Sequence, residues 1–172
     1  MKAHHSLLFV AIGCAVGLSS PGWAQDKKPI SYGSRATSKY VQEQAIDVGD
    51  VPGHQVRVYQ IHFVYPKDGM VIDGAQVKES ETYGMSDYTN GTGLFNIYAV
   101  YLMEDGSKVF ARGGGATQSS ADGARSFYAA TQIVGGTGRY KAIRGQVRAK
   151  GQRAAGANSL TDESSGEYWF EE

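Results

Sequence analysis

Acid–base chemistry in this sequence would fall to a small number of carboxylates. Glu79 and Glu81 alternate with polar residues in a strand-like stretch, on the same predicted face as Val77 and Tyr83. A carboxylate enclosed among apolar side chains has a raised pKa and can exchange a proton near neutral pH. Glu79 and Glu81 are therefore the catalytic candidates. The alternative is that they are surface charges, since glutamate is seldom buried.

Histidine is the other residue type that could do chemistry here. His62 is flanked by Ile61 and Phe63 in a stretch whose two faces are both largely apolar or aromatic. We take His62 as a candidate ligand-binding residue, with a hydrogen-bonded core or interface histidine as the alternative. No His-x-His or His-x-x-x-His spacing supports a zinc site, so no metal and no cofactor is predicted.

A hairpin signal places two further candidates. Asp105-Gly106 separates two β-rich runs, and a two-residue turn there would set Tyr98 opposite Gly113 and Asn96 opposite Gly115. Glycine has no side chain, so Asn96 and Tyr98 would border open space, as at the mouth of a barrel that admits a ligand. The alternative is that Tyr98 fills the space beside Gly113.

Eight segments of strand character, separated by turn signals, must position these residues. They cover residues 39–48, 55–65, 75–85, 93–103, 107–117, 126–134, 143–153 and 166–170. Residues 41–45 of the first segment could also be helical. Twenty-three glycines, eleven tyrosines and four prolines suit twisted strands joined by tight turns. We predict one all-β domain over residues 39–172, an eight-stranded antiparallel β-barrel, with a two-sheet sandwich as the alternative.

The first 24 residues predict an export signal. Lys2 precedes an apolar run over residues 7–18, and Gly22-Trp23-Ala24 provides a processing site. We expect cleavage after Ala24 and a periplasmic or secreted protein without a membrane span in its mature form. A lipoprotein signal ending at Cys14 is the alternative. Residues 25–38 are polar and predict a poorly ordered N-terminal arm.

The charge of the chain excludes one class of partner. Lys and Arg number 17, as do Asp and Glu, and no basic run occurs. Nucleic acid is therefore not an expected partner.

A glycine-rich segment carries a family resemblance. Residues 133–145 read Ile-Val-Gly-Gly-Thr-Gly-Arg-Tyr-Lys-Ala-Ile-Arg-Gly, a strand end, a turn and the start of another strand. This segment resembles a turn of dirigent proteins and is similar to the corresponding turn of allene oxide cyclases. The resemblance implies an eight-stranded antiparallel barrel that forms homotrimers. The predicted structural turn comprises Gly135, Gly136, Thr137, Gly138 and Tyr140, with Tyr140 packed beneath it.

Three functions remain open at this point. The first is a dirigent-like barrel that binds a small apolar or phenolic molecule without catalysis. The second is a cofactor-independent cyclase or isomerase that resembles allene oxide cyclase, with Glu79 or Glu81 as its acid or base. The third is an oligomeric structural or partner-binding protein that uses the outer face of residues 55–65.

Overall fold

Antiparallel strands make up most of the structure, a computed structural model that describes residues 26–157 and 159–172, without the side chains of residues 34 and 35. The predicted signal peptide, its cleavage site and the lipoprotein alternative lie outside the described residues. The strands are β1 (Lys28–Asp47), β2 (His54–Val64), β3 (Val71–Ile72), β4 (Ala75–Thr89), β5 (Thr92–Met103), β6 (Lys108–Ser119), β7 (Arg125–Gly136), β8 (Ile143–Arg153) and β9 (Ser159–Phe170), with a 3₁₀ turn, η1 (Gly138–Tyr140), before β8.

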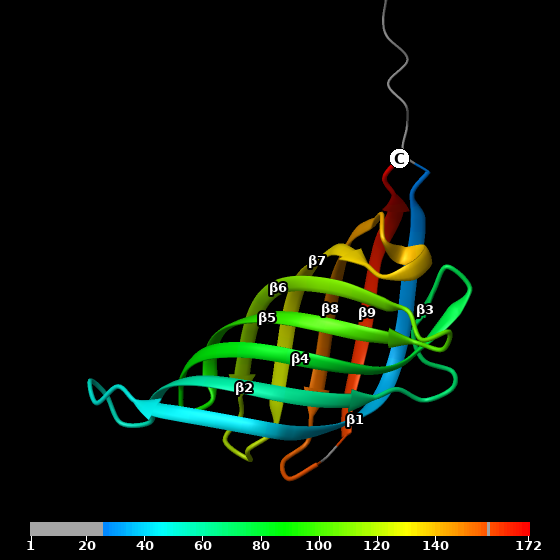
Figure 1. The fold of residues 1–172 in the computed structure, drawn as a ribbon. Helices are drawn as coiled ribbons and strands as arrows, with labels where there is room; N and C mark the ends of the chain where they lie inside the picture. The colour runs from blue at the N-terminus through cyan, green and yellow to red at the C-terminus, as the bar shows by residue number, and fades with distance from the viewer. Residues whose placement is uncertain (1–25, 158) are drawn as a thin grey trace, which may run out of the picture.

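The eight long strands form a closed ring (Figure 1). From β4 to β9 each strand pairs with the next in sequence, β2 pairs with β4, and β1 pairs with both β2 and β9. Every long strand therefore has two hydrogen-bonded neighbours, and β1 meets one of them along each half of its length. This confirms the predicted eight-stranded antiparallel barrel and excludes the sandwich. β3 adds only a two-residue pairing to β4.

β1 is longer than the sequence indicated, and it closes the ring. Its first half pairs with β9 from Lys28 to Thr37, and its second half pairs with β2 from Thr37 to Asp47. The predicted disordered arm is therefore wrong for residues 28–38, and the helical alternative for residues 41–45 is wrong as well. Ile30 and Ala36 are buried, and the residues that follow them, Ser31 and Thr37, are exposed, so this polar stretch still has an apolar inward face.

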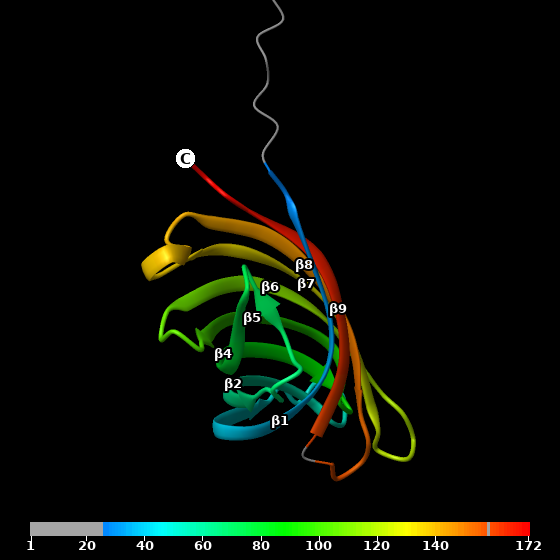
Figure 2. The same ribbon diagram turned by 90° about the vertical axis from the view of Figure 1, so that its right-hand side faces the viewer.

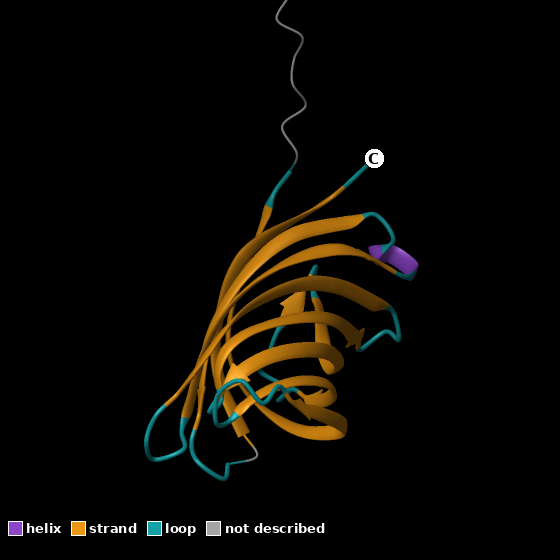
Figure 3. Ribbon diagram, turned by 90° about the vertical axis from the view of Figure 1, so that its left-hand side faces the viewer, coloured by secondary structure: helices purple, strands orange, loops and turns teal. Residues whose placement is uncertain are grey.

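One end of the barrel is packed shut. The connection from β2 to β4, with β3, lies across this end (Figures 2 and 3). Its Met70 and Ile72 belong to an apolar cluster that fills the barrel there. The other members are Ile30, Ala75, Val77, Met103, Val109, Ile133, Tyr140, Ile143 and Tyr168.

The turn from β7 to β8 is tied to this closed end by Tyr140. Its ring is completely buried, and its hydroxyl donates to the carbonyl of Ile72 at 3.0 Å. The Arg139 guanidinium donates in turn to the Tyr140 hydroxyl at 2.6 Å. Gly138 has φ +57°, a conformation that glycine adopts without strain. The glycine-rich segment therefore forms a short turn and does not begin a long helix.

The hairpin between β5 and β6 differs from the predicted one by a single residue. Met103 N–H donates to the Ser107 carbonyl, so the loop comprises three residues, Glu104, Asp105 and Gly106. Gly106 has φ +82°, as in a type I turn followed by a left-handed residue. Adding one loop residue moves each predicted partner by one position, which reverses the face of the β5 side chains relative to those of β6.

Candidate functional site

The barrel holds an interior cavity of about 220 Å³ between its closed end and its open end. The cavity reaches the strand ends next to the β6–β7 and β8–β9 connections, and we call this end the mouth. Its walls are mainly aromatic. The lining side chains include Tyr32, Tyr40, Tyr59, Ile61, Phe63, Tyr65, Tyr88, Phe95, Ile97, Tyr101, Phe127, Val147 and Leu160.

Strand alternation explains why these side chains converge. On β5, Phe95, Ile97 and Tyr101 line the cavity, whereas Asn96 and Tyr98 between them are exposed. The other strands follow the same rule. Their inward positions next to β5 are small, with glycine at 113 and 115 on β6, so the aromatic rings have room.

A polar cluster lies deeper in the cavity, beside the apolar closed end. It comprises the carboxylate of Asp162, the hydroxyls of Ser164 and Ser80, and the phenols of Tyr32 and Tyr65. Asp162 is 9% exposed, and its Oδ2 accepts from Ser164 Oγ at 3.5 Å. Tyr65 Oη lies 3.2 Å from Ser80 Oγ. Asp162 is the one carboxylic acid among the cavity's described lining residues.

Burial keeps the deep phenols protonated. It raises the pKa of Tyr32 and Tyr65 well above the ordinary value. Burial, with the nearby Asp162 carboxylate, raises the pKa of Tyr101 to about 12. These hydroxyls are therefore neutral hydrogen-bonding groups at physiological pH and do not act as bases. Acid–base chemistry inside the barrel would depend on Asp162.

The mouth carries arginines. Arg125 on β7 and Arg153 on β8 line the cavity and are directly opposite each other in the strand register. Arg153 Nη2 donates to Ser38 Oγ. Among the described side chains, neither Arg125 nor Arg153 forms an ion pair. By contrast, Arg57 near the same end is paired with Glu43.

Asn96 and Tyr98 do not border the cavity as predicted. Asn96 is opposite Gly114 and Tyr98 is opposite Arg112, while Ile97 is opposite Gly113. Tyr98 is 41% exposed on the outer face and stacks on Phe110 with ring centroids 6.4 Å apart. The predicted opening between Tyr98 and Gly113 is therefore wrong, and its physical cause is the extra residue in the β5–β6 loop.

Glu79, Glu81 and His62 also lie on the outer face. The register shifts between Val77 and Glu79, so Val77 is fully buried while Glu79 and Glu81 point outward. His62 Nδ1–H donates to Glu81 Oε1 at 2.7 Å, on the neighbouring strand. None of the three lines the interior cavity.

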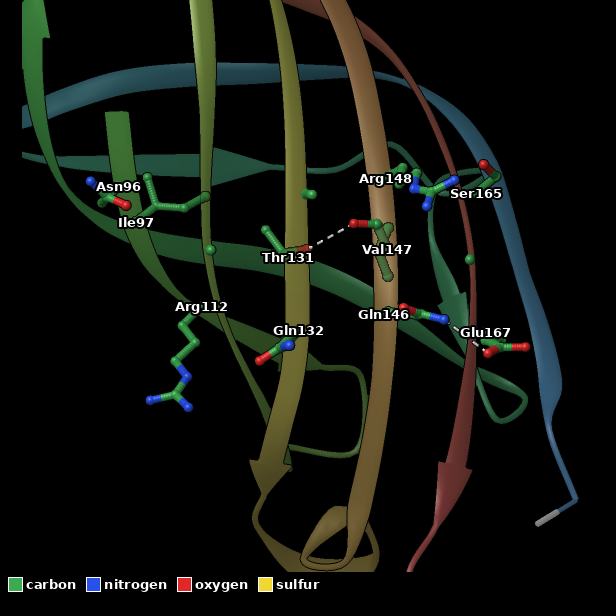
Figure 4. A pocket seen from close by; sticks show the side chains of 13 residues that line it. Asn96, Ile97, Arg112, Thr131, Gln132, Gln146, Val147, Arg148, Ser165 and Glu167 are labelled. Atoms are coloured by element: carbon green, nitrogen blue, oxygen red, sulfur yellow. Dashed lines mark hydrogen bonds between the residues drawn. The ribbon is translucent and has the colours of Figure 1, made fainter. Parts of the chain in front are cut away.

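A second hollow, of about 780 Å³, lies on strands β5–β9 (Figure 4). It is bordered mainly by exposed polar side chains of the outer face, among them Asn96, Arg112, Gln132, Gln146 and Arg148. Its described lining includes no aromatic side chain, whereas the walls of the cavity are mainly aromatic. The hollow is therefore a poorer candidate for a small-molecule site than the cavity.

Sequence reasoning missed Asp162, Arg125 and Arg153. Asp162 lies in the polar stretch Thr-Asp-Glu-Ser-Ser, which precedes the last predicted strand. The alternation of Leu160, Asp162 and Ser164 with exposed residues is the signal that would have placed them on one inward face.

The described part of the chain contains no group of three or more His, Cys, Asp or Glu side chains placed to hold a metal ion. Within residues 26–157 and 159–172, no helix has the length and apolar character needed to span a membrane.

Comparison with known proteins returns structural likeness at low sequence identity. The pterocarpan synthase dirigent protein PsPTS1 is similar with a TM-score of 0.48 and 14% identity, over 86% of this chain and 97% of that chain. The pterocarpan synthase dirigent protein GePTS1 has a TM-score of 0.46 and 11% identity, over 96% of this chain and 100% of that chain. No protein-family model and no curated protein matches the chain.

Proposed function

We propose that this protein is a dirigent-like barrel that binds a small apolar or phenolic molecule in its interior cavity. The observation that carries the proposal is the cavity itself, an aromatic-walled space of about 220 Å³ with a polar cluster at its deep end. A cavity of about 150 Å³ lined by apolar side chains admits benzene. The space here therefore suits one substituted aromatic ring, and the Tyr and Ser hydroxyls would orient its polar group.

Two adjacent alanines on β7 give a direct test with a built-in control. Ala129 lines the cavity, and Ala130 is exposed on the outer face. Titration of the mature protein with 4-hydroxybenzyl alcohol by ligand-observed NMR should give saturable binding. Ala129→Phe should abolish this binding by filling the cavity, and Ala130→Phe should preserve it.

A second blocking variant guards against misfolding of the first. Ala149→Leu fills the same space from β8, directly opposite Ala129. Each variant is checked by far-ultraviolet circular dichroism before titration. If the wild type does not bind phenols, or if both folded blocking variants bind like the wild type, the cavity is not the site.

Asp162 supports a second candidate function, a cofactor-independent cyclase or isomerase. An enzyme of this class needs an acid or base in contact with its substrate, and Asp162 is the carboxylic acid lining the described cavity. Glu79 and Glu81 do not line the cavity. Asp162→Asn should remove turnover of a converted ligand while leaving its binding within about threefold, whereas unchanged turnover would reject the assignment.

Export and assembly complete the proposal. The signal-like residues 1–24 support a periplasmic or secreted location, and mass spectrometry of the exported protein should give Gln25 as its first residue.

Assembly into a homo-oligomer, a trimer by the family resemblance, is supported by exposed apolar side chains on the outer face of β2 and β4. The largest of these are Val58, Tyr83 and Met85.

A further inference from the structure

We propose that the ligand of the cavity is a single-ring phenolic acid, whose carboxylate binds between Arg125 and Arg153 at the mouth. This inference rests on the proposed function, because it assigns a chemical class to the ligand of the same cavity. It depends on one juxtaposition, two arginines placed opposite each other at the entrance of an aromatic-walled space.

Arg125 and Arg153 lie opposite each other in the strand register, and their guanidinium groups contact different parts of the mouth. Arg153 Nη2 donates to Ser38 Oγ, and Arg125 Nη2 lies beside Gly91. Like charges directly opposite each other on neighbouring strands destabilise a sheet. Within the described chain, Arg125 and Arg153 have no carboxylate partner, although Arg57 at the same end has Glu43. A planar carboxylate between two guanidinium groups would relieve the repulsion through charge-assisted hydrogen bonds.

The volume and lining of the cavity below the arginines determine what the rest of the ligand can be. Below the arginines the lining is aromatic, with Phe127 from β7 and Phe95 from β5. A volume of about 220 Å³ accepts one ring and is small for a long acyl chain or a two-ring product. The ligand is therefore a monocyclic aromatic acid, with its ring between the mouth and the polar cluster.

Asp162 sets the polarity of the far end of the ligand. On β9 it is opposite Gly151, two residues further into the barrel than Arg153. A carboxylate accepts hydrogen bonds, so the end of the ligand that faces Asp162 is the one that carries a hydrogen-bond donor. A phenolic hydroxyl at the opposite end of the ring would donate to the carboxylate or to the deep hydroxyls.

Two probes that differ in one group test the inference. 4-Hydroxybenzoate carries the carboxylate, and 4-hydroxybenzyl alcohol has a neutral hydroxymethyl group in its place. In calorimetric titration at low salt the acid should bind the wild type at least tenfold more tightly, as one charge-assisted contact provides. Raising the salt concentration should weaken binding of the acid and leave that of the alcohol unchanged.

Replacement of the arginines should remove the preference for the acid over the alcohol and should leave binding of the alcohol unchanged. Arg125→Gln and Arg153→Gln should each reduce the acid-to-alcohol ratio severalfold, and the double variant should bring it near one. Arg148→Gln, exposed on the outer face of β8, is the matched control and should retain the wild-type ratio. Unliganded thermal stability should not fall in Arg125→Gln, because this change removes a like-charge repulsion, whereas Arg153→Gln also loses the hydrogen bond to Ser38 Oγ.

The outcomes separate the two proposals. If the wild type binds neither probe, or if Ala129→Phe leaves the binding of both unchanged, the cavity function fails and the ligand class falls with it. If both probes bind in the cavity with equal affinity, or if the double arginine variant keeps the preference, only the phenolic-acid assignment is overturned.

Discussion

Tyr59 on β2 packs over Gly84, its register partner on β4, and its ring occupies the space that a side chain at residue 84 would need. Tyr59 also lines the cavity. This glycine therefore determines where one aromatic wall of the candidate site lies. A methyl group added there would displace the ring, because the interior of the barrel is closely packed on that side.

We expect Gly84→Ala to destabilise the protein by about 1–3 kcal/mol, as overpacking of a filled interior does. It should also change the affinity of the cavity for 4-hydroxybenzyl alcohol, since Tyr59 must move. Urea unfolding followed by circular dichroism measures the first effect and titration the second. Gly33→Ala is the control: its new methyl would lie 3.6 Å from the Asp162 carbonyl, an ordinary contact, so stability should change by less than about 0.5 kcal/mol.

Tyr140 joins the β7–β8 turn to the apolar cluster at the closed end, and its hydroxyl contributes to stability separately from its ring. Tyr140→Phe would leave the Ile72 carbonyl without the donor now 3.0 Å away, in a fully buried position. We expect a loss of about 1–3 kcal/mol in the free energy of unfolding. Tyr128→Phe, 67% exposed on the outer face, should be neutral. Equal stability of the two variants would show that the hydroxyl is not a structural tie.

The barrel could be predicted from the sequence because runs of strand-forming residues are separated by turn signals. The segment at 55–65 is rich in β-branched and aromatic residues, and β2 spans His54–Val64. Strand number and order followed from eight such segments, and the ring of pairings agrees with them.

The site could not be predicted because it depends on single-residue register. An Asp-Gly turn fits both a two-residue and a three-residue loop, and the difference exchanges Tyr98 for Ile97 on the inner wall. The bulge after Val77 turned Glu79 and Glu81 outward in the same way. Asp162 was not predicted as a site residue because the composition of a polar strand does not reveal which of its positions face inward.

The outer face of β2 and β4 gives a test of assembly. Val58 and Met85 are directly opposite each other and are 61% and 51% exposed, an apolar pairing that a second copy of the chain would cover. We expect the wild type to sediment as an oligomer at micromolar concentration and Val58→Glu to sediment as a monomer. Val71→Glu, 52% exposed on β3, is the matched control and should keep the wild-type mass. A monomeric wild type would end the proposal of assembly through this face.

His54 should make the stability of the protein depend on pH. Its Nδ1 lies 2.5 Å from Asp50 Oδ1, in the connection between β1 and β2, and its Nε2 lies 2.7 Å from Asp87 Oδ1 on β4. The hydrogen bonds to Asp50 and Asp87 raise the pKa of His54 above its ordinary value of 6.5, and the hydrogen bond from His54 lowers the pKa of Asp50 below 3.8. The protonated imidazole thus ties the connection to β4.

The sign of the effect follows from these directions. The contribution of His54 to the free energy of unfolding is complete below pH 6.5 and is lost as the pH rises through its raised pKa. The contribution of Asp50 is complete above pH 3.8 and is lost as the pH falls through its lowered pKa. The melting temperature of the wild type should therefore exceed that of His54→Gln most between these two values, and the difference should shrink by pH 8.5. Differential scanning fluorimetry across this range measures it. A difference between wild type and His54→Gln that is constant with pH would mean that the imidazole acts through its shape and not through its charge.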